Sequence, residues 1–227
     1  MLGRHVLGLC AKHALAPRLC AGLRGDKQRG VTLLELAVVM AIIAILAALS
    51  APGMGAWLQN AQIRTATEAI QNGLQLARAQ AVQRNRDTRF QLTSTLDASC
   101  VLSTTSSNWV VSFDDPAGSC NSAFINEAFA DSDATNNPAP RIIQRRAQAE
   151  GSRNATVAAD QAAITFNAMG RVVPAPAAAI NINISNPTGG TCAAEGGTMR
   201  CLRVAVSPGG QVRMCDPSLA SSDPRGC

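Results

Sequence analysis

The sequence predicts an α+β protein in which a long N-terminal helix packs on a small antiparallel β-sheet head. Three observations predict this architecture. Residues 31–51 form an almost uninterrupted apolar run, residues 63–81 repeat apolar side chains at helical spacing, and short β-prone runs separated by turns follow residue 85. The 227 residues leave room for one apolar segment and one modest globular domain.

The apolar run from Val31 to Ala51 carries one charged side chain, that of Glu35. At about 1.5 Å per helical residue the run matches the roughly 30 Å hydrocarbon thickness of a bilayer, so it predicts a transmembrane helix over 31–53. A lone carboxylate in such a segment is a candidate functional residue, because an unpaired charge in lipid is costly. Basic residues precede the run, which predicts a single-pass protein with a cytoplasmic N-terminus and a periplasmic head.

Helical periodicity continues beyond the apolar run. Pro52 predicts a bend rather than an end, because a proline removes one backbone hydrogen bond and the periodicity resumes at once. We therefore expect one helix from about Thr32 to about Arg84, with residues 54–86 forming an amphipathic half. The apolar face of this half consists of Ile63, Ala66, Ile70, Leu74, Ala77 and Ala81.

The remaining residues, 87–227, predict a periplasmic β-rich head. Ile180, Ile182 and Ile184 alternate with asparagines, as expected of a half-buried strand. Ser207–Gly210 separates the last two strands as a hairpin turn. A long acidic loop is expected over Asp114–Pro140. The expected strands are Thr88–Thr93, Cys100–Ser103, Trp109–Phe113, Arg141–Arg145, Ala163–Asn167, Ala179–Ile184, Leu202–Val206 and Gln211–Cys215.

The positive net charge of the chain belongs to its first 30 residues. These hold six Lys and Arg against one Asp, whereas residues 31–227 hold 14 Arg against 14 Asp and Glu. A chain beginning at Val31 also has no His, Lys or Tyr. Most general-base, nucleophilic and Schiff-base chemistry is thereby excluded, and we expect no enzyme and no cofactor.

Six of the eight cysteines follow the apolar run, and an even number in an exported domain predicts disulfides. Six cysteines allow 15 pairings. We weakly prefer Cys100 with Cys120, plus local pairing among the last four. No C-x-x-C motif or nearby histidine indicates a metal site. The six residues are Cys100, Cys120, Cys192, Cys201, Cys215 and Cys227.

The segment from Arg29 to Leu36, which reads Arg-Gly-Val-Thr-Leu-Leu-Glu-Leu, resembles the processing site of type IV pilins and type II secretion pseudopilins. The resemblance implies that residues 1–30 are a prepilin leader, that a prepilin peptidase cuts between Gly30 and Val31, and that Val31 is then N-methylated. It also implies that Glu35 pairs with the N-terminal amine of a neighbouring subunit's Val31. Val31 stands where phenylalanine is usual.

Two further stretches, Leu74–Asn85 and Ile164–Arg171, resemble the H-type pseudopilin and FimT-like minor pilin group. Some FimT-like proteins are implicated in DNA uptake through a Gly-Arg-x-Arg turn. The matching place here reads Gly-Gln-Val-Arg over 210–213, so one arginine is lost. If the last hairpin pairs Cys201 with Cys215, Arg203 and Arg213 lie opposite each other as candidate anion or DNA contacts. A second basic cluster comprises Arg141, Arg145, Arg146 and Arg153.

The resemblance implies a non-catalytic minor pilin or pseudopilin that joins the priming or tip complex of a type IV pilus or a type II secretion pseudopilus. Its expected partners are other pilins or pseudopilins, which it contacts through the N-terminal helix, the prepilin peptidase and the bacterial inner membrane. Two alternatives remain at this point. One is a DNA-binding minor pilin, which the neutral mature chain does not favour. The other is an unrelated signal-anchored periplasmic domain.

Overall fold

The computed structural model describes residues 31–227, so the leader, with Gly30, lies outside the described residues. The chain divides into two compact units, Met1–Leu46 and Ala47–Cys227, and each is described by itself. Helix α1 (Leu33–Gln83) does not end at Pro52, and its ends lie within one residue of those expected. Across residues 31–227, no helix has the length and apolar content needed to cross a bilayer.

The strands of the described chain form two antiparallel sheets. A five-stranded sheet has the order β3-β2-β1-β5-β6, and a four-stranded sheet has the order β4-β7-β8-β9. The strand bounds are β1 Thr88–Thr93, β2 Asn108–Ser112, β3 Ile142–Arg146, β4 Thr156–Ala159, β5 Ala163–Phe166, β6 Val172–Val173, β7 Ile180–Ser185, β8 Leu202–Val206 and β9 Val212–Cys215.

Most of the expected strands are confirmed, and β1 and β8 have the expected bounds. The strand expected over Cys100–Ser103 is wrong, because only Leu102 pairs, in an isolated bridge to Thr93. The structure adds β4 and β6, which the sequence did not indicate. The α+β class, with one long helix and an antiparallel head, is confirmed.

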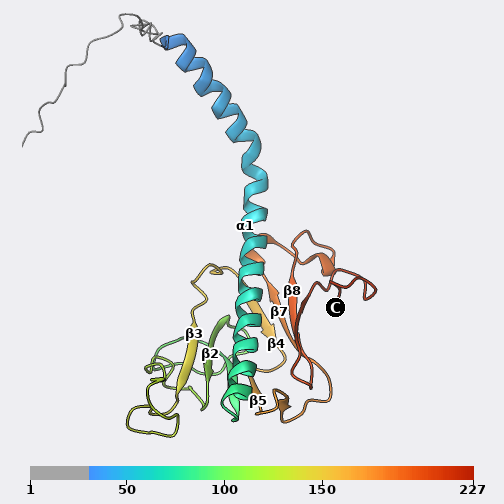
Figure 1. Ribbon diagram of the computed structural model, residues 1–227. Coiled ribbons are helices and arrows are strands. Elements are labelled where there is room, and N and C mark those ends of the chain that lie inside the picture. Colours follow the sequence, from blue (N-terminus) through green and yellow to red (C-terminus); the bar gives the residue numbers. More distant parts are fainter. Residues whose placement is uncertain (1–30) are drawn as a thin grey trace, which may run out of the picture. The chain divides into compact units, whose positions relative to one another are not determined.

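The main core lies where the second half of α1 crosses the two sheets. Figure 1 shows this part of α1 between the β2–β3 side of the head and the β7–β8 side. All six apolar positions of the expected helix face are buried, and Ile63, Ile70 and Leu74 have no exposed surface. They pack in one cluster with β1 and β2 on one side and with β4, β7 and β8 on the other. Both sheets therefore share one helix face.

Gly73 brings α1 close to the five-stranded sheet. A Cβ atom at this position would lie 2.8 Å from Cε2 of Phe90 and 3.2 Å from the Trp109 ring. The rings of Phe90 and Trp109 are themselves 5.7 Å apart, centroid to centroid. The missing side chain of Gly73 thus makes room for an aromatic pair under the helix.

The outer face of the five-stranded sheet is covered by the loop over 114–140. Val110 and Ile142 are buried there against the Cys100–Cys120 disulfide, in a second, smaller core. Asn137 organises the loop from within, since its Nδ2 donates to the carbonyl oxygens of Asn126, Phe129 and Ala130. The loop is therefore a folded layer of the head, although it contains no strand.

Candidate assembly surface

The described part of the first unit presents apolar side chains to solvent. Every residue from Val31 to Leu46 is exposed, with Leu33 at 86% and Leu34 at 74%. An apolar surface of this extent marks a site that contacts a membrane or another protein. The predicted cleavage position, Gly30, lies outside the described residues, and the adjoining Val31 is 72% exposed.

Glu35 stands in the first turn of α1, where the sequence also holds a helix-capping motif. The Thr32 hydroxyl accepts a hydrogen bond from the Glu35 backbone nitrogen at 3.2 Å, which makes Thr32 the N-cap. Thr-x-x-Glu is the sequence of a capping box, and a carboxylate here is also favoured by the helix dipole. The Glu35 side chain has no hydrogen bond or ion pair within residues 31–227, so its carboxylate is available to a partner.

The six cysteines of the described chain form three disulfides. They join Cys100 to Cys120, Cys192 to Cys201 and Cys215 to Cys227. The first closes the loop that covers the five-stranded sheet, and the other two are local, with sequence separations of 9 and 12. Disulfides of this kind are typical of exported domains.

The basic cluster expected after residue 140 is mostly engaged within the head. Arg141 makes a bidentate pair with Asp114, both distances being 2.6 Å. Arg145 donates to the carbonyl oxygens of Cys120 and Ser122, and Arg146 donates to that of Glu150. Arg141 and Arg145 thus bind the 114–140 loop to the sheet, whereas Arg146 contacts the turn that follows its own strand. Among the four, only Arg153 has a side chain without a partner in residues 31–227.

Arg203 and Arg213 share the outer face of the four-stranded sheet, but they do not lie opposite each other. Arg203 pairs with Cys215 and Arg213 with Ala205, so the two arginines are diagonal neighbours. The expected register, with Cys201 opposite Cys215, is wrong by two residues because the chain reverses over five residues between Val206 and Val212. Arg203 donates to Oδ1 of Asn183 and Arg213 to the Gly226 carbonyl. Neither has a carboxylate partner in the described chain.

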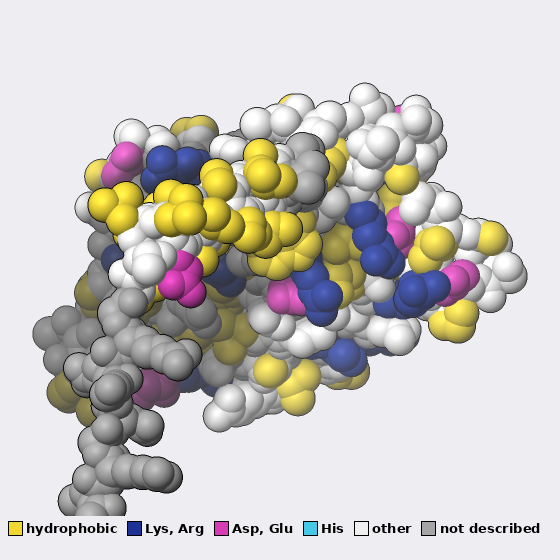
Figure 2. Space-filling model, turned by 90° about the horizontal axis from the view of Figure 1, so that it is seen from above, with side chains coloured by type: hydrophobic (Ala, Val, Ile, Leu, Met, Phe, Trp, Pro, Cys, Tyr) yellow, Lys and Arg dark blue, Asp and Glu magenta, His cyan; other side chains and the backbone are white. Residues whose placement is uncertain are grey.

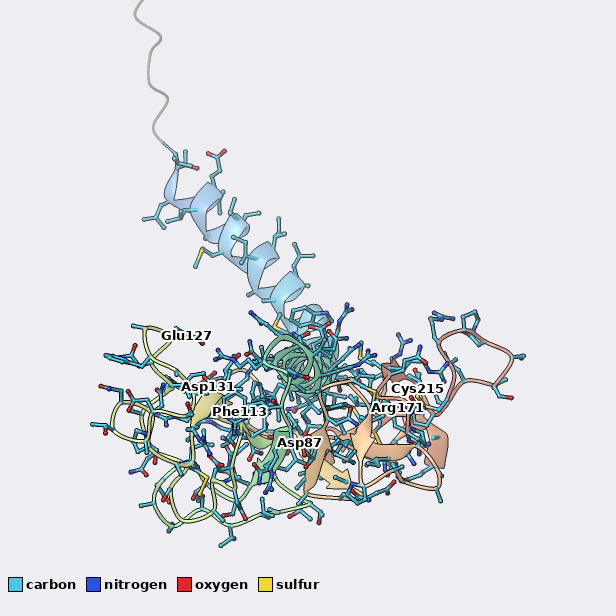
Figure 3. The ribbon with its side chains drawn as sticks, turned by 60° about the horizontal axis from the view of Figure 1, so that its bottom comes forward. Asp87, Phe113, Glu127, Asp131, Arg171 and Cys215 are labelled. Atoms are coloured by element: carbon cyan, nitrogen blue, oxygen red, sulfur yellow. A yellow bond between two sulfur atoms is a disulfide. The ribbon has the colours of Figure 1, made fainter. Side chains whose placement is uncertain are left out.

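Two arginines at the end of α1 link it to distant parts of the head, which sequence reasoning missed. Nε of Arg78 donates to the Gly170 carbonyl at 3.1 Å, and this contact joins the two internal stretches that carry the pilin resemblance. Arg84 donates to Glu127 at 2.5 Å and to Asp131 at 2.6 Å. Figure 3 labels these two acids on the loop beside the end of α1. The sequence did contain one indication of these contacts, because that loop has five acidic residues and no basic residue of its own.

A third group of charges lies at the C-terminus of the head. Asp216, whose side chain is 4% exposed, accepts a hydrogen bond from Nε of Arg200 at 2.8 Å. Burial works against its charge, but hydrogen bonds from Ser218 and Arg200 outweigh burial and hold the pKa of Asp216 below its usual value. Hydrogen bonds from the Arg225 side chain and backbone lower the pKa of Asp223 to about 2. Both carboxylates are therefore ionised at neutral pH.

The charges of the head are interleaved rather than separated by sign. On the face shown in Figure 2, arginine side chains lie beside Asp and Glu side chains. Within residues 31–227, no three His, Cys, Asp or Glu side chains are grouped so that they could hold a metal ion. That face of the head therefore carries no large field of one sign.

The long helix, the antiparallel head and the terminal motif define a type IV pilin-like protein. A family model described as a prokaryotic N-terminal methylation motif matches residues 25–51, a range that includes Gly30, Val31 and Glu35. A second model, described as type II transport protein GspH, matches residues 66–210, more than half of the chain. The chain belongs to this GspH family. An unrelated signal-anchored domain is thereby excluded.

The chain is similar to the type IV minor pilin FimU of Pseudomonas aeruginosa strain PAO1, which has been solved in two crystal forms. In the first form the identity is 17%, the match covers 72% of this chain and 98% of the FimU chain in that structure, and the TM-score is 0.42. In the second the identity is 16%, with coverage of 73% and 94% and the same TM-score. No curated protein matches the sequence.

Proposed function

We propose that this protein is a non-catalytic minor pilin or pseudopilin, processed after Gly30 and anchored in the bacterial inner membrane by residues 31–53. The amphipathic half-helix, 54–86, and the head, 87–227, then lie in the periplasm. The subunit joins the priming or tip complex that starts a type IV pilus or a type II secretion pseudopilus. Membership of the GspH family supports this proposal.

The isolated charge of Glu35 is the observation that supports the proposal most directly. Glu35 is the only charged side chain between Val31 and Ala51, it is exposed, and it has no partner within residues 31–227. A carboxylate among packed apolar helices requires a cation. Cleavage after Gly30 creates one, the N-terminal amine of Val31. We infer that Glu35 of one subunit pairs with that amine on its neighbour.

A matched pair of variants tests the assembly role. Glu35→Gln removes the charge with little change in volume and should block incorporation into the filament while membrane insertion continues. Glu195→Gln is the control, because Glu195 is an exposed acid of the head whose side chain has no partner within residues 31–227. Incorporation is measured as the amount of the subunit in sheared filaments. Normal incorporation of Glu35→Gln would contradict the ion pair.

Processing is tested on the protein recovered from membranes. Mass spectrometry of the N-terminal peptide should show Val31 as the first residue, heavier by one methyl group. A chain that still begins upstream of Gly30, or an unmethylated Val31, would contradict this part of the proposal.

DNA binding is the second candidate function, and one observation favours it. Arg203 and Arg213 line a shallow hollow of about 260 Å³ and have no carboxylate partner among residues 31–227. Two arginines supply few phosphate contacts, so any binding should be weak and strongly salt-dependent. Retention of the purified protein on duplex DNA at low salt, lost in an Arg203→Ala/Arg213→Ala variant, would support it. No retention at low salt would exclude it.

A further inference from the structure

A groove of about 680 Å³ lies between α1 and the C-terminal loop over 216–227, within the second unit. Its volume is in the range of sites that hold a ligand or several side chains. Figure 3 shows this loop projecting beyond Cys215, at the edge of the four-stranded sheet. The groove residues that carry the argument are Trp57, Arg64, Arg200, Met214, Pro224 and Arg225.

The C-terminal wall of the groove is a built structure. The Cys215–Cys227 disulfide closes the loop, and the Asp216 backbone nitrogen donates to the Arg225 carbonyl at 2.7 Å. The Asp216 carboxylate accepts from both the backbone nitrogen and the hydroxyl of Ser218, at 2.9 and 2.6 Å. Oδ1 of Asn60 on α1 accepts from the Arg200 backbone nitrogen at 2.9 Å. The two walls are thus tied together at the Arg200 end.

Three arginines in the groove are held by one edge, and each presents a free edge. Arg64 and Arg200 are bonded only through Nε, to Glu68 at 2.7 Å and to Asp216 at 2.8 Å. The four Nη atoms of these two side chains make no hydrogen bond within residues 31–227. Arg225 uses Nε and Nη2 on Asp223, which leaves Nη1 free. All three side chains are 58% exposed or more, so the free donors can reach an incoming acceptor.

Trp57 gives the groove an apolar anchor point. Its side chain lies in the second unit and the residue is 70% exposed, whereas the only other tryptophan, Trp109, is buried. Met214 and Pro224 add apolar surface beside the arginines. Tryptophan and arginine, supported by methionine, are the residues that are enriched where protein–protein interfaces gain most of their affinity.

We propose that this groove docks a segment of a neighbouring filament subunit that presents a carboxylate beside an apolar side chain. The carboxylate binds the free Nη groups of Arg64, Arg200 and Arg225, and the apolar side chain packs on Trp57 and Met214. This inference rests on the proposed function. Along the sequence, Trp57 follows shortly after the apolar segment of α1 that the proposal places between subunits.

The charges of the groove favour a protein segment over a lipid surface. Glu68, Asp216 and Asp223 balance the three arginines, so the cluster exerts little attraction over distance on an anionic membrane. Its donors act at short range and in fixed directions, which suits an acceptor delivered by docking. A phosphate headgroup would also leave the apolar walls at Met214 and Pro224 uncovered.

The test is site-specific photo-crosslinking of the full chain in cells that assemble the filament. Trp57 is replaced by p-benzoyl-phenylalanine, which keeps an aromatic surface, and crosslinked peptides are identified by mass spectrometry. We expect the crosslink in another pilin-type subunit, within one helical turn of an Asp or Glu. Arg64→Glu or Arg225→Glu in the same background should lower the yield about fivefold or more. Reversing the mapped carboxylate to Arg should restore it.

Arg171→Glu is the control, since Arg171 is exposed, its side chain makes no hydrogen bond or ion pair within residues 31–227, and it does not line the groove. Crosslinks to lipid or DNA alone, crosslinks to segments without a carboxylate, or an unchanged yield in both groove variants would overturn the docking inference. The proposed function fails separately, through normal incorporation of Glu35→Gln. If incorporation depends on Glu35 but crosslinks from position 57 reach only lipid, the groove inference is contradicted and the proposed function is not.

Discussion

The Arg84 guanidinium donates to Oδ1 of Asp131 at 2.6 Å, across 47 positions of sequence. Both side chains are mostly buried, at 17% and 19% exposed. Arg84 follows the last residue of α1, and Asp131 lies in the loop that covers the five-stranded sheet. The contact therefore fastens this outer layer of the head to the helix that forms its core.

Replacing Arg84 should loosen the loop. In Arg84→Ala, Asp131 loses a charged donor at a mostly buried site, and we expect the free energy of unfolding to fall by about 1–3 kcal/mol. Amide hydrogen exchange over residues 121–137 should rise. Arg64→Ala removes only an exposed pair within α1, and it should change stability by about 0.5 kcal/mol or less. Equal effects of the two variants would contradict the fastening role.

Gly73 and Gly55, both in α1, should respond to alanine in opposite directions. Gly73→Ala places a Cβ atom 2.8 Å from the Phe90 ring, and we expect overpacking to lower the free energy of unfolding by about 1–3 kcal/mol. A Cβ atom at position 55 would have no neighbour within 4 Å. Gly55→Ala should therefore raise the free energy of unfolding by up to about 1 kcal/mol through its higher helix propensity. Thermal unfolding followed by circular dichroism measures both. If Gly73→Ala raised the free energy of unfolding, α1 and the five-stranded sheet would be able to move apart without loss of stability, which would contradict the close packing at this position.

The Cys100–Cys120 disulfide should contribute strongly to the stability of the head. Both sulfurs are buried in the smaller core, and the closed loop has a sequence separation of 20. Replacing both cysteines by alanine should lower the free energy of unfolding by about 3 kcal/mol. Protease cleavage should then appear within residues 114–140 before the rest of the head. Cleavage elsewhere first would place the weak point outside this loop.

Stability should fall as the pH drops from about 4 to about 2. The pKa of Asp223, about 2, and that of Asp216 lie below the ordinary 3.8. In this window the unfolded chain binds more protons than the folded one, so acid favours unfolding. Denaturation midpoints at a series of pH values should show this loss. Asp216→Asn should weaken it, whereas Glu195→Gln, an exposed acid without a side-chain partner in residues 31–227, should preserve it.

Strong periodicity made the helix and the longer strands predictable. All six residues of the predicted apolar face are buried, because apolar residues alternate with Arg, Gln and Glu at helical spacing. Thr67, Ala69 and Gly73 of α1 are also buried, and the apolar pattern did not include them. β4 was missed because Val157 is its one large apolar residue, and β6 was missed because it has two residues. At Cys100 the β-prone composition was misleading, since the disulfide to Cys120 and the contacts of that loop shape the backbone there.

The contacts that tie distant segments together could not be read from spacing. Nothing in the sequence specifies that Arg84 meets Asp131 or that Arg78 meets Gly170, because both depend on how α1 crosses the sheets. The diagonal placement of Arg203 and Arg213 depends on the length of one turn. The Thr32 cap, by contrast, could be predicted from the Thr-x-x-Glu sequence.

Because the core of the head is built on α1, the order of synthesis matters. Ile63, Ile70 and Leu74 are made before every strand that covers them, and the last of these strands to contribute core residues, β8, lies more than a hundred residues later. During that interval β1, β2 and β5 can cover only part of this apolar face, because β7 and β8 are made last. A newly made chain is therefore sensitive to aggregation and proteolysis until synthesis is nearly finished, and a holding chaperone would act on the uncovered part of this helix.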